Sequence, residues 1–143
     1  MRKVSFLLAL LLILSFLSAC GDSDGVVEIR ERFFVNQFQD IVTNHEEYLG
    51  RTIRYEGAFE TFPQDGGGED VYFVYRVVPT CCSPGGSIGF LLDLGEFAPL
   101  ADDAWVEVTG VLELFEFRGF PNLRLVVTSL VELDERGELM VQP

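Results

Sequence analysis

The chain has 143 residues, with 10 Lys and Arg against 23 Asp and Glu, so its formal net charge is −13. This length suits one domain, and a hydrophobic fraction of 48% with 13% aromatic residues is enough for a packed core. Composition therefore argues against a disordered chain and against a two-domain enzyme. The acidity disfavours nucleic acid as a partner, because phosphate backbones are bound through Lys and Arg.

The N-terminal segment has the pattern of a bacterial export signal. Arg2 and Lys3 precede an apolar run over residues 4–17, and small residues follow it. The run is shorter than the about 20 apolar residues that a membrane-spanning helix needs. A plain signal peptide, or a short membrane anchor with an unmodified cysteine, is the competing interpretation.

The tetrapeptide LSAC, which ends at Cys20, resembles the lipobox of bacterial lipoproteins. That resemblance implies cleavage before Cys20 and attachment of acyl chains such as palmitate to this residue. We therefore expect a signal peptide over residues 1–19, a lipidated Cys20 with a flexible tether over 20–25, and a single domain over 26–143. The mature protein would lie on the extracytoplasmic face of the cell membrane, held there by its lipid.

The first part of the mature chain has mixed periodicity. Val27 and Ile29 alternate as in a strand, whereas Phe34, Phe38 and Ile41 recur as on one face of a helix. We expect a short strand followed by a helix. Beyond it, Thr43 and Asn44 each precede a Glu by three residues, which predicts a capping box, and Gly50 is placed to end the capped turn.

From Gly50 onward the hydrophobic pattern has period two, which is typical of strands. Gly57 and Gly110 lie inside two of the predicted strands, where a sheet that closes on itself needs a bend. We therefore predict a mostly β fold, a small five-stranded OB-like barrel preceded by the short strand-helix segment. A seven-stranded sandwich is the competing fold. The expected strands fall within residues 53–59, 71–77, 88–92, 106–114 and 123–133.

Two connections have their own character. The segment over residues 93–103 is a longer link in which we expect a helical turn, and a turn over 118–122 joins the last two strands. Phe115, Phe117 and Phe120 flank that turn. We expect them to cover one end of the barrel, with an apolar docking patch as the alternative.

Cys81 and Cys82 form the most unusual segment of the chain, PTCCSPGG. In an oxidising compartment two adjacent thiols are bonded, metal-bound or protected. A vicinal disulfide strains the intervening peptide and is easily reduced. A structural role, a metal site and redox exchange all stay open from the sequence.

A site for zinc or another divalent metal would need four ligands, of which Cys81 and Cys82 can supply two. His45 is the one imidazole of the chain and a weak candidate ligand, since a histidine in a capped turn is more often a surface residue than a ligand. The acids that could complete such a site are Asp65, Glu69, Asp70, Asp102 and Asp103.

The sequence lacks GxSxG, Walker A and HExxH motifs, so we do not expect an enzyme. A pair of Cys81 or Cys82 with His45 is arithmetically possible, yet the surrounding acids would keep the thiol protonated.

Three ordered segments resemble the C-terminal domain of the YcgQ-like family. They run from Asp40 through NHEEYLGRTI to Gly57, from Arg76 through TCC to Gly89, and over DDAWVEVTG, which begins at Asp102. The family consists of bacterial membrane proteins of uncharacterised activity that are regarded as permease subunits. In it, membrane helices stand where this chain has a lipid anchor. The paired cysteines of the family lead into a segment with an Asp, whereas this chain has SPGG.

The resemblance implies an extracytoplasmic accessory or ligand-binding module of a permease that handles a metal or another cation. The alternative is a vicinal-thiol redox or metal-transfer protein that uses Cys81 and Cys82. A barrel wall that binds oligosaccharide or peptide is a third hypothesis, by analogy of fold alone.

Overall fold

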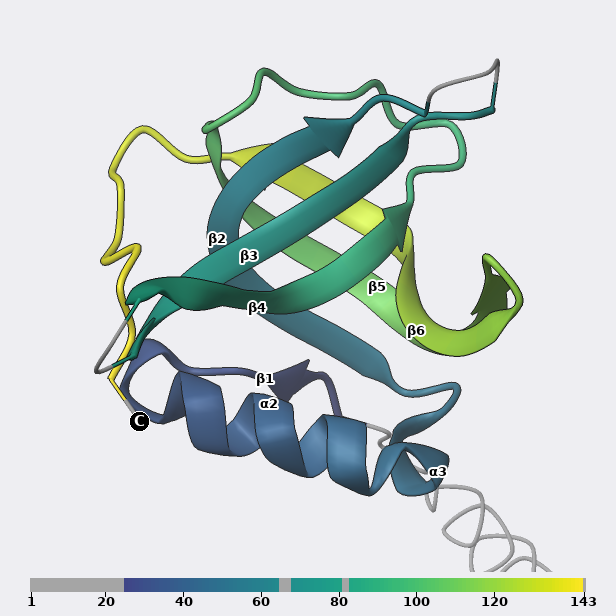
Figure 1. The fold of residues 1–143 in the computed structure, drawn as a ribbon, viewed down its shortest axis with the longest axis horizontal. Helices are drawn as coiled ribbons and strands as arrows, with labels where there is room; N and C mark the ends of the chain where they lie inside the picture. Colours follow the sequence, from purple (N-terminus) through teal and green to yellow (C-terminus); the bar gives the residue numbers. More distant parts are fainter. Residues whose placement is uncertain (1–24, 65–67, 81–82, 143) are drawn as a thin grey trace, which may run out of the picture.

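The structure is a computed structural model that describes residues 25–64, 68–80 and 83–142 (Figure 1). The N-terminal part holds β1 (Val27–Glu28), a 3₁₀ turn (Glu31–Phe33), α2 (Phe34–Thr43) and α3 (His45–Tyr48). The predicted strand followed by a helix is thus confirmed. The long strands are β2 (Thr52–Phe62), β3 (Val71–Thr80), β4 (Ser83–Asp93), β5 (Trp105–Phe117) and β6 (Phe120–Glu132).

The strands form one sheet in the order β1-β2-β3-β4-β6-β5, and pairing of β2 with β5 closes it. β1 and β2 are parallel, as are β4 and β6, and the other pairs are antiparallel. Strands β2 to β6 therefore make the closed, five-stranded, OB-like barrel that the sequence predicts. Figure 1 shows α2 running across one end of this barrel.

Barrel closure depends on the two glycines inside the strands. β2 pairs with β5 up to Ala58 and with β3 from Ala58 onward, so it bends across both halves of the sheet. A Cβ at Gly57 would lie 2.7 Å from the carbonyl oxygen of Tyr75, and one at Gly110 would lie 2.7 Å from that of Val126. The β5–β6 register also shifts between Thr109 and Gly110. The predicted bends are confirmed at both positions.

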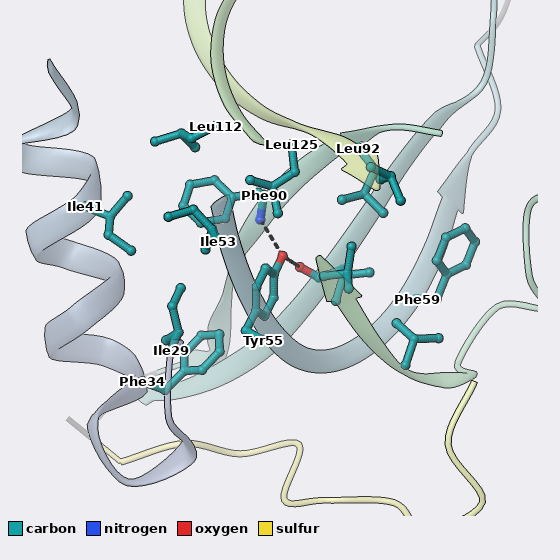
Figure 2. Close-up of a cluster of buried hydrophobic side chains, with 14 of the residues drawn as sticks. Ile29, Phe34, Ile41, Ile53, Tyr55, Phe59, Phe90, Leu92, Leu112 and Leu125 are labelled. Atoms are coloured by element: carbon teal, nitrogen blue, oxygen red, sulfur yellow. Dashed lines mark hydrogen bonds between the residues drawn. The ribbon is translucent and has the colours of Figure 1, made fainter. Parts of the chain in front are cut away.

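The core fills the barrel and continues under α2 (Figure 2). Tyr55 lies at its centre, where its hydroxyl donates to the carbonyl of Val74 at 2.7 Å and accepts from the amide of Phe90 at 3.0 Å. Phe34 and Ile41, on the inner face of α2, are fully buried, and Phe34 meets Tyr55 edge to face with 5.7 Å between ring centroids. The helix thus closes the barrel end, which we expected Phe115, Phe117 and Phe120 to cover.

Three local predictions are corrected. The capping box at Asn44 is wrong, because this side chain makes no cap and instead donates to the Asp40 carboxylate at 2.7 Å. Gly50, by contrast, ends the turn with φ of 79°. The β5–β6 turn consists of Arg118 and Gly119 alone, both with positive φ, so β6 begins earlier than predicted. Residues 93–103 form turns and bends without a helix.

Over the described ranges, none of the helices has the length and apolar character to cross a bilayer.

Candidate functional site

A groove of about 800 Å³ lies between α2, the outer face of β3 and β4, and the hairpin of β5 and β6. Figure 1 shows the arrangement of these elements: α2 runs below β4, and the hairpin of β5 and β6 curls away from the barrel. We refer to this feature as the groove and describe each side in turn.

The floor of the groove comes from β3 and β4. Phe73 and Leu91 stand opposite each other in the register, and they alternate with the buried Val74 and Phe90, so they face outward. Gly89 completes the floor. A Cβ at this position would lie 1.9 Å from the Val74 carbonyl oxygen, so the position excludes every larger residue and leaves the floor without a side chain there.

The helical side of the groove is built by Phe38, Val42 and His45. The ring of Phe38 packs against that of Phe90, with 4.8 Å between centroids, which ties α2 to β4. Val42 is exposed. Phe38 and Val42 lie one helical turn apart in α2, so the apolar side of this helix supplies most of the wall, and His45 extends it at the start of α3.

The opposite side is the β5–β6 hairpin, which contributes Leu114, Phe117 and Leu123. Phe115 and Phe117 pack together with centroids 6.1 Å apart. Phe120, at the hairpin tip, is 73% exposed. The expectation that these three phenylalanines cover a barrel end is therefore wrong, and the alternative of an apolar surface fits their positions.

The groove has few polar side chains, and those it has are engaged locally. Nδ1 of His45 lies 3.2 Å from the carbonyl oxygen of Val42, one turn back on the helix. The side-chain oxygen of Asn122 accepts from the amide of Leu123 at 2.8 Å. The remaining lining residues are apolar or glycine. The groove therefore presents shape and apolar surface, with its polar side chains already hydrogen-bonded to nearby backbone.

Strands β4 and β6 stop pairing at the groove. They pair in parallel at Leu91–Asp93 with Arg124–Val126, and in the described chain that short ladder is their whole contact as strands. Toward Gly89 on β4 and Pro121 on β6, the two edges separate, and residues of both line the groove. The groove is thus a wedge between two strand edges.

A second region, around Arg76, is polar and closed. The Arg76 side chain is 2% exposed, and its Nε and Nη1 donate to the carbonyl oxygens of Glu56 and Glu138, both at 2.8 Å. Glu31 and Glu56 carboxylates lie 3.6 and 4.0 Å from the guanidinium. We call this arrangement the Arg76 latch. Burial lowers the pKa of Arg76, and the carboxylates of Glu31 and Glu56 oppose that shift.

Two aromatic rings complete the latch. The guanidinium of Arg76 lies 5.3 Å from the ring centroid of Phe34 and 4.7 Å from that of Trp105, so it makes cation–π contacts with both. Arg136 stacks on Trp105 at 5.4 Å. The latch thereby joins the start of α2, the barrel and the C-terminal tail.

The acidic part of the family-like segment DDAW also has structural roles. Asp102 accepts from the amide of Thr61 at 2.8 Å. Asp103 has φ of 68°, a left-handed conformation that Asp tolerates, and its carboxylate accepts from Arg136 at 2.7 Å, which lowers the Asp103 pKa. Both carboxylates are therefore committed to the fold.

The first family-like segment also makes structural contacts. Asp40 accepts hydrogen bonds from Tyr48 and Asn44, and these bonds lower the pKa of the Asp40 carboxyl. Arg51 lies over the Tyr48 ring at 5.3 Å. This cluster fixes α3 against α2 and places His45 at the end of the groove.

The predicted metal ligands are brought together only in part. Glu69 and Asp70 line a second depression, of about 550 Å³, which shares Leu91 and Phe117 with the groove. Among the described residues, no group of three or more His, Cys, Asp and Glu side chains is arranged to hold a metal ion. Cys20, Asp65, Cys81 and Cys82 lie outside the described residues, so the predictions on them stay predictions.

Sequence reasoning did not identify the groove. In the sequence its residues belong to separate predicted strands and a helix, and the aromatic set at the hairpin indicates part of it. The Arg76 latch was also missed, although Arg76 and Trp105 both fall in the family-like segments. A buried Arg within an otherwise hydrophobic strand, VYFVYRVV, is the signal that marks it.

A family model described as the DUF1980 C-terminal domain matches residues 18–137. No curated protein matches the chain.

Proposed function

Because the chain belongs to the DUF1980 C-terminal domain family, we propose that it is a non-catalytic accessory module that binds a membrane partner through the groove. Lipid on Cys20 would hold the module on the extracytoplasmic face of the cell membrane. The partner would be a permease that handles a metal or another cation, as the resemblance of the sequence implies.

The groove is the observation that carries this proposal. Its lining is apolar, and its two hydrogen-bonding side chains, His45 and Asn122, are already engaged with backbone. Exposed apolar surface of this kind marks a binding site. The groove offers no cluster of polar side chains that would position a small polar substrate, which supports binding rather than chemistry.

Charge supports a membrane partner with a basic outer face. Removal of residues 1–19 takes two cations and no acid from the chain, so the mature protein carries 8 − 23 = −15. In the structure four of the arginines already pair with acids: Arg54, Arg76, Arg124 and Arg136. A long-range field of this sign attracts cationic surfaces and repels anionic headgroups.

Site-specific photo-crosslinking in native membranes tests the binding proposal. Leu114 lines the groove and is 47% exposed, whereas Val131 lies near the other end of the same hairpin and is 46% exposed. Benzoylphenylalanine at position 114 should give a discrete adduct with an integral membrane protein, and the same group at 131 should not. Equal adducts at both positions, or none at 114, would rule out the groove as the binding surface.

The anchor is tested separately. Mass spectrometry of the mature N-terminal peptide should show an acylated Cys20, and Cys20→Ser should leave an unprocessed or released protein. A Cys20 found unmodified in the mature chain would remove the membrane placement and leave the groove to be judged by the crosslinks alone.

The vicinal-thiol alternative concerns Cys81 and Cys82. Replacement of both by Ser should abolish a thiol-exchange or metal-transfer activity if that alternative holds, with far-UV circular dichroism as the control for folding. An unchanged adduct at position 114 in the same double variant would separate the two functions.

A further inference from the structure

We propose that the groove binds an extended peptide segment, which adds as a strand to the free edge of β4, and that this segment carries basic residues beside its apolar ones. The inference deepens the proposed function, since it names the chemistry that the same groove recognises. It does not depend on the lipid anchor.

The first support is the wedge between β4 and β6. β3 pairs with β4 along its length, whereas β6 reaches β4 only at Leu91–Asp93 within the described ranges. The opposite edge of β4 around Gly89 therefore has no strand beside it in that part of the chain. β6 likewise pairs with β5 over residues 120–123 and leaves its other edge to the groove.

A free strand edge presents backbone N–H and C=O groups that another strand can pair with. Natural edges are usually covered or made polar, but this one opens into an apolar groove. An added strand would continue the β3–β4 sheet at the point where β4 leaves β6. This is the geometry of peptide recognition by strand addition.

The side chains around the edge fit an extended peptide. Side chains along a strand alternate between two faces, so every second side chain of a segment added beside β4 would share the outer face with Leu91 and approach the wall formed by Phe38. The missing side chain at Gly89 leaves room for the peptide backbone. The remaining residues of the segment would face solvent.

The scarcity of polar side chains distinguishes a peptide strand from other ligands. An oligosaccharide needs several side-chain partners for its hydroxyls, and His45 and Asn122 are the polar side chains of the lining, each with one of its two polar atoms already bonded to backbone. A helix satisfies its own backbone and would leave the edge of β4 unpaired. An added strand uses the backbone hydrogen-bonding groups along the unpaired edge of β4.

The charges beside the groove indicate the flanks of the segment. Glu46 follows His45, and Glu116 precedes Phe117. The nearby cation, Arg118, donates to Gln64 and lies over the ring of Phe117. Acidic groups thus lie at both the helical and hairpin sides, which favours Lys or Arg next to the apolar positions of the bound segment.

The test uses a display library of random linear peptides, selected on the mature full-length protein. We expect enriched sequences with apolar residues at every second position and Lys or Arg between or beside them. Leu114→Asp should weaken the best synthetic peptide by about tenfold or more. The matched variant Val131→Asp should leave its binding unchanged.

Backbone methylation then distinguishes strand addition from simple apolar contact. N-methylation of the peptide amides that face β4 should each weaken binding by roughly tenfold, and methylation of the alternate amides should not. Uniform tolerance of methylation, enrichment with helical spacing, or equal binding to the Leu114→Asp variant would each overturn the proposal. Peptide binding with no membrane adduct at position 114 would instead retain the strand-binding groove and reject the membrane partner.

Discussion

The two ends of α2 meet the barrel in opposite ways. At Phe34, the helix begins beside a buried arginine that donates to two backbone carbonyls and contacts two aromatic rings. Near its other end, at Val42, α2 borders an apolar groove that has a free strand edge on its opposite side. The side chains at the first end contact one another within the domain, whereas the second end leaves apolar side chains and a strand edge open to a partner.

This contrast separates residues of the three family-like segments from the residues that we propose to bind a partner. Arg76, Asp102, Asp103 and Trp105 fall in the family-like segments, and each is committed to internal contacts. The groove is instead lined by ordinary apolar residues. A sequence motif can therefore mark how a domain is built, and the binding surface can lie elsewhere.

The largest effect is expected from Arg76→Met, which tests whether the latch is essential. Met has a similar volume, but it leaves the Glu56 and Glu138 carbonyls without a donor and removes both cation–π contacts. We expect a loss of about 2–4 kcal/mol in the free energy of unfolding, because unsatisfied buried acceptors are costly. Urea unfolding measures it. Arg76→Lys keeps the charge but lacks the planar guanidinium group. Its free energy of unfolding should therefore lie between those of the unchanged protein and Arg76→Met.

Unchanged or increased stability in Arg76→Met would mean that the latch resembles those buried ion pairs that apolar residues replace without loss. The buried arginine would then help to specify a single arrangement of α2 on the barrel without stabilising the fold.

Gly89→Ala is expected to have the next largest effect, at the open end. Its Cβ would meet the backbone oxygen of Val74 at 1.9 Å, so β3 and β4 must shift. We expect about 1–3 kcal/mol of destabilisation, measured by thermal unfolding, with the groove closed or distorted. Gly86 on the same strand has nothing within 4 Å of its Cβ position, so Gly86→Ala is the matched control. Equal effects of the two changes would contradict the tight floor.

Tyr55→Phe tests whether the groove floor is held from inside the barrel. The change removes the hydroxyl that joins Val74 on β3 to Phe90 on β4 and leaves both backbone groups unpaired. We expect a cost of about 1–2 kcal/mol. Hydrogen exchange should rise at the Phe90 amide and stay unchanged at Gly50, which donates to Leu112 elsewhere. Uniform change at both amides would contradict a local role.

Asp40→Asn should have the smallest effect and one that depends on pH. Hydrogen bonds lower the pKa of Asp40 in the folded state, so its contribution is present above the pKa of the unfolded state, about 4, and is lost as pH falls below it. The variant should therefore show a smaller difference in melting temperature between neutral pH and about pH 3. Tyr48→Phe, which removes the main donor, should reproduce this behaviour. A steeper acid dependence in either variant would contradict the assignment.

The barrel could be predicted because each of its strands is marked by a pattern of neighbouring residues. Alternating hydrophobicity over residues such as Val106 and Val108 marks each strand, and Gly57 and Gly110 mark the bends. The same holds for the helix at Phe34, Phe38 and Ile41. These patterns need no knowledge of which strands meet.

The groove and the latch could not be predicted because both depend on long-range contacts. Arg76 donates to Glu138, 62 residues later in the chain, and no spacing in the sequence indicates that pair. The groove exists because β4 and β6 separate beyond Leu91, which depends on the curl of the hairpin. The capping box at Asn44 failed since Asp40 is a nearer partner for its amide.

The C-terminal tail completes the Arg76 latch, so the latch forms only after the tail has docked. Leu139 and Val141 exchange backbone hydrogen bonds with Val77, and Glu138 supplies a carbonyl to Arg76. A folding chain in which residues 138–141 have not yet docked therefore holds a buried arginine with one of its acceptors missing. Formation of the barrel and completion of the latch are therefore separable events in folding, and the second requires Glu138 to dock beside Arg76.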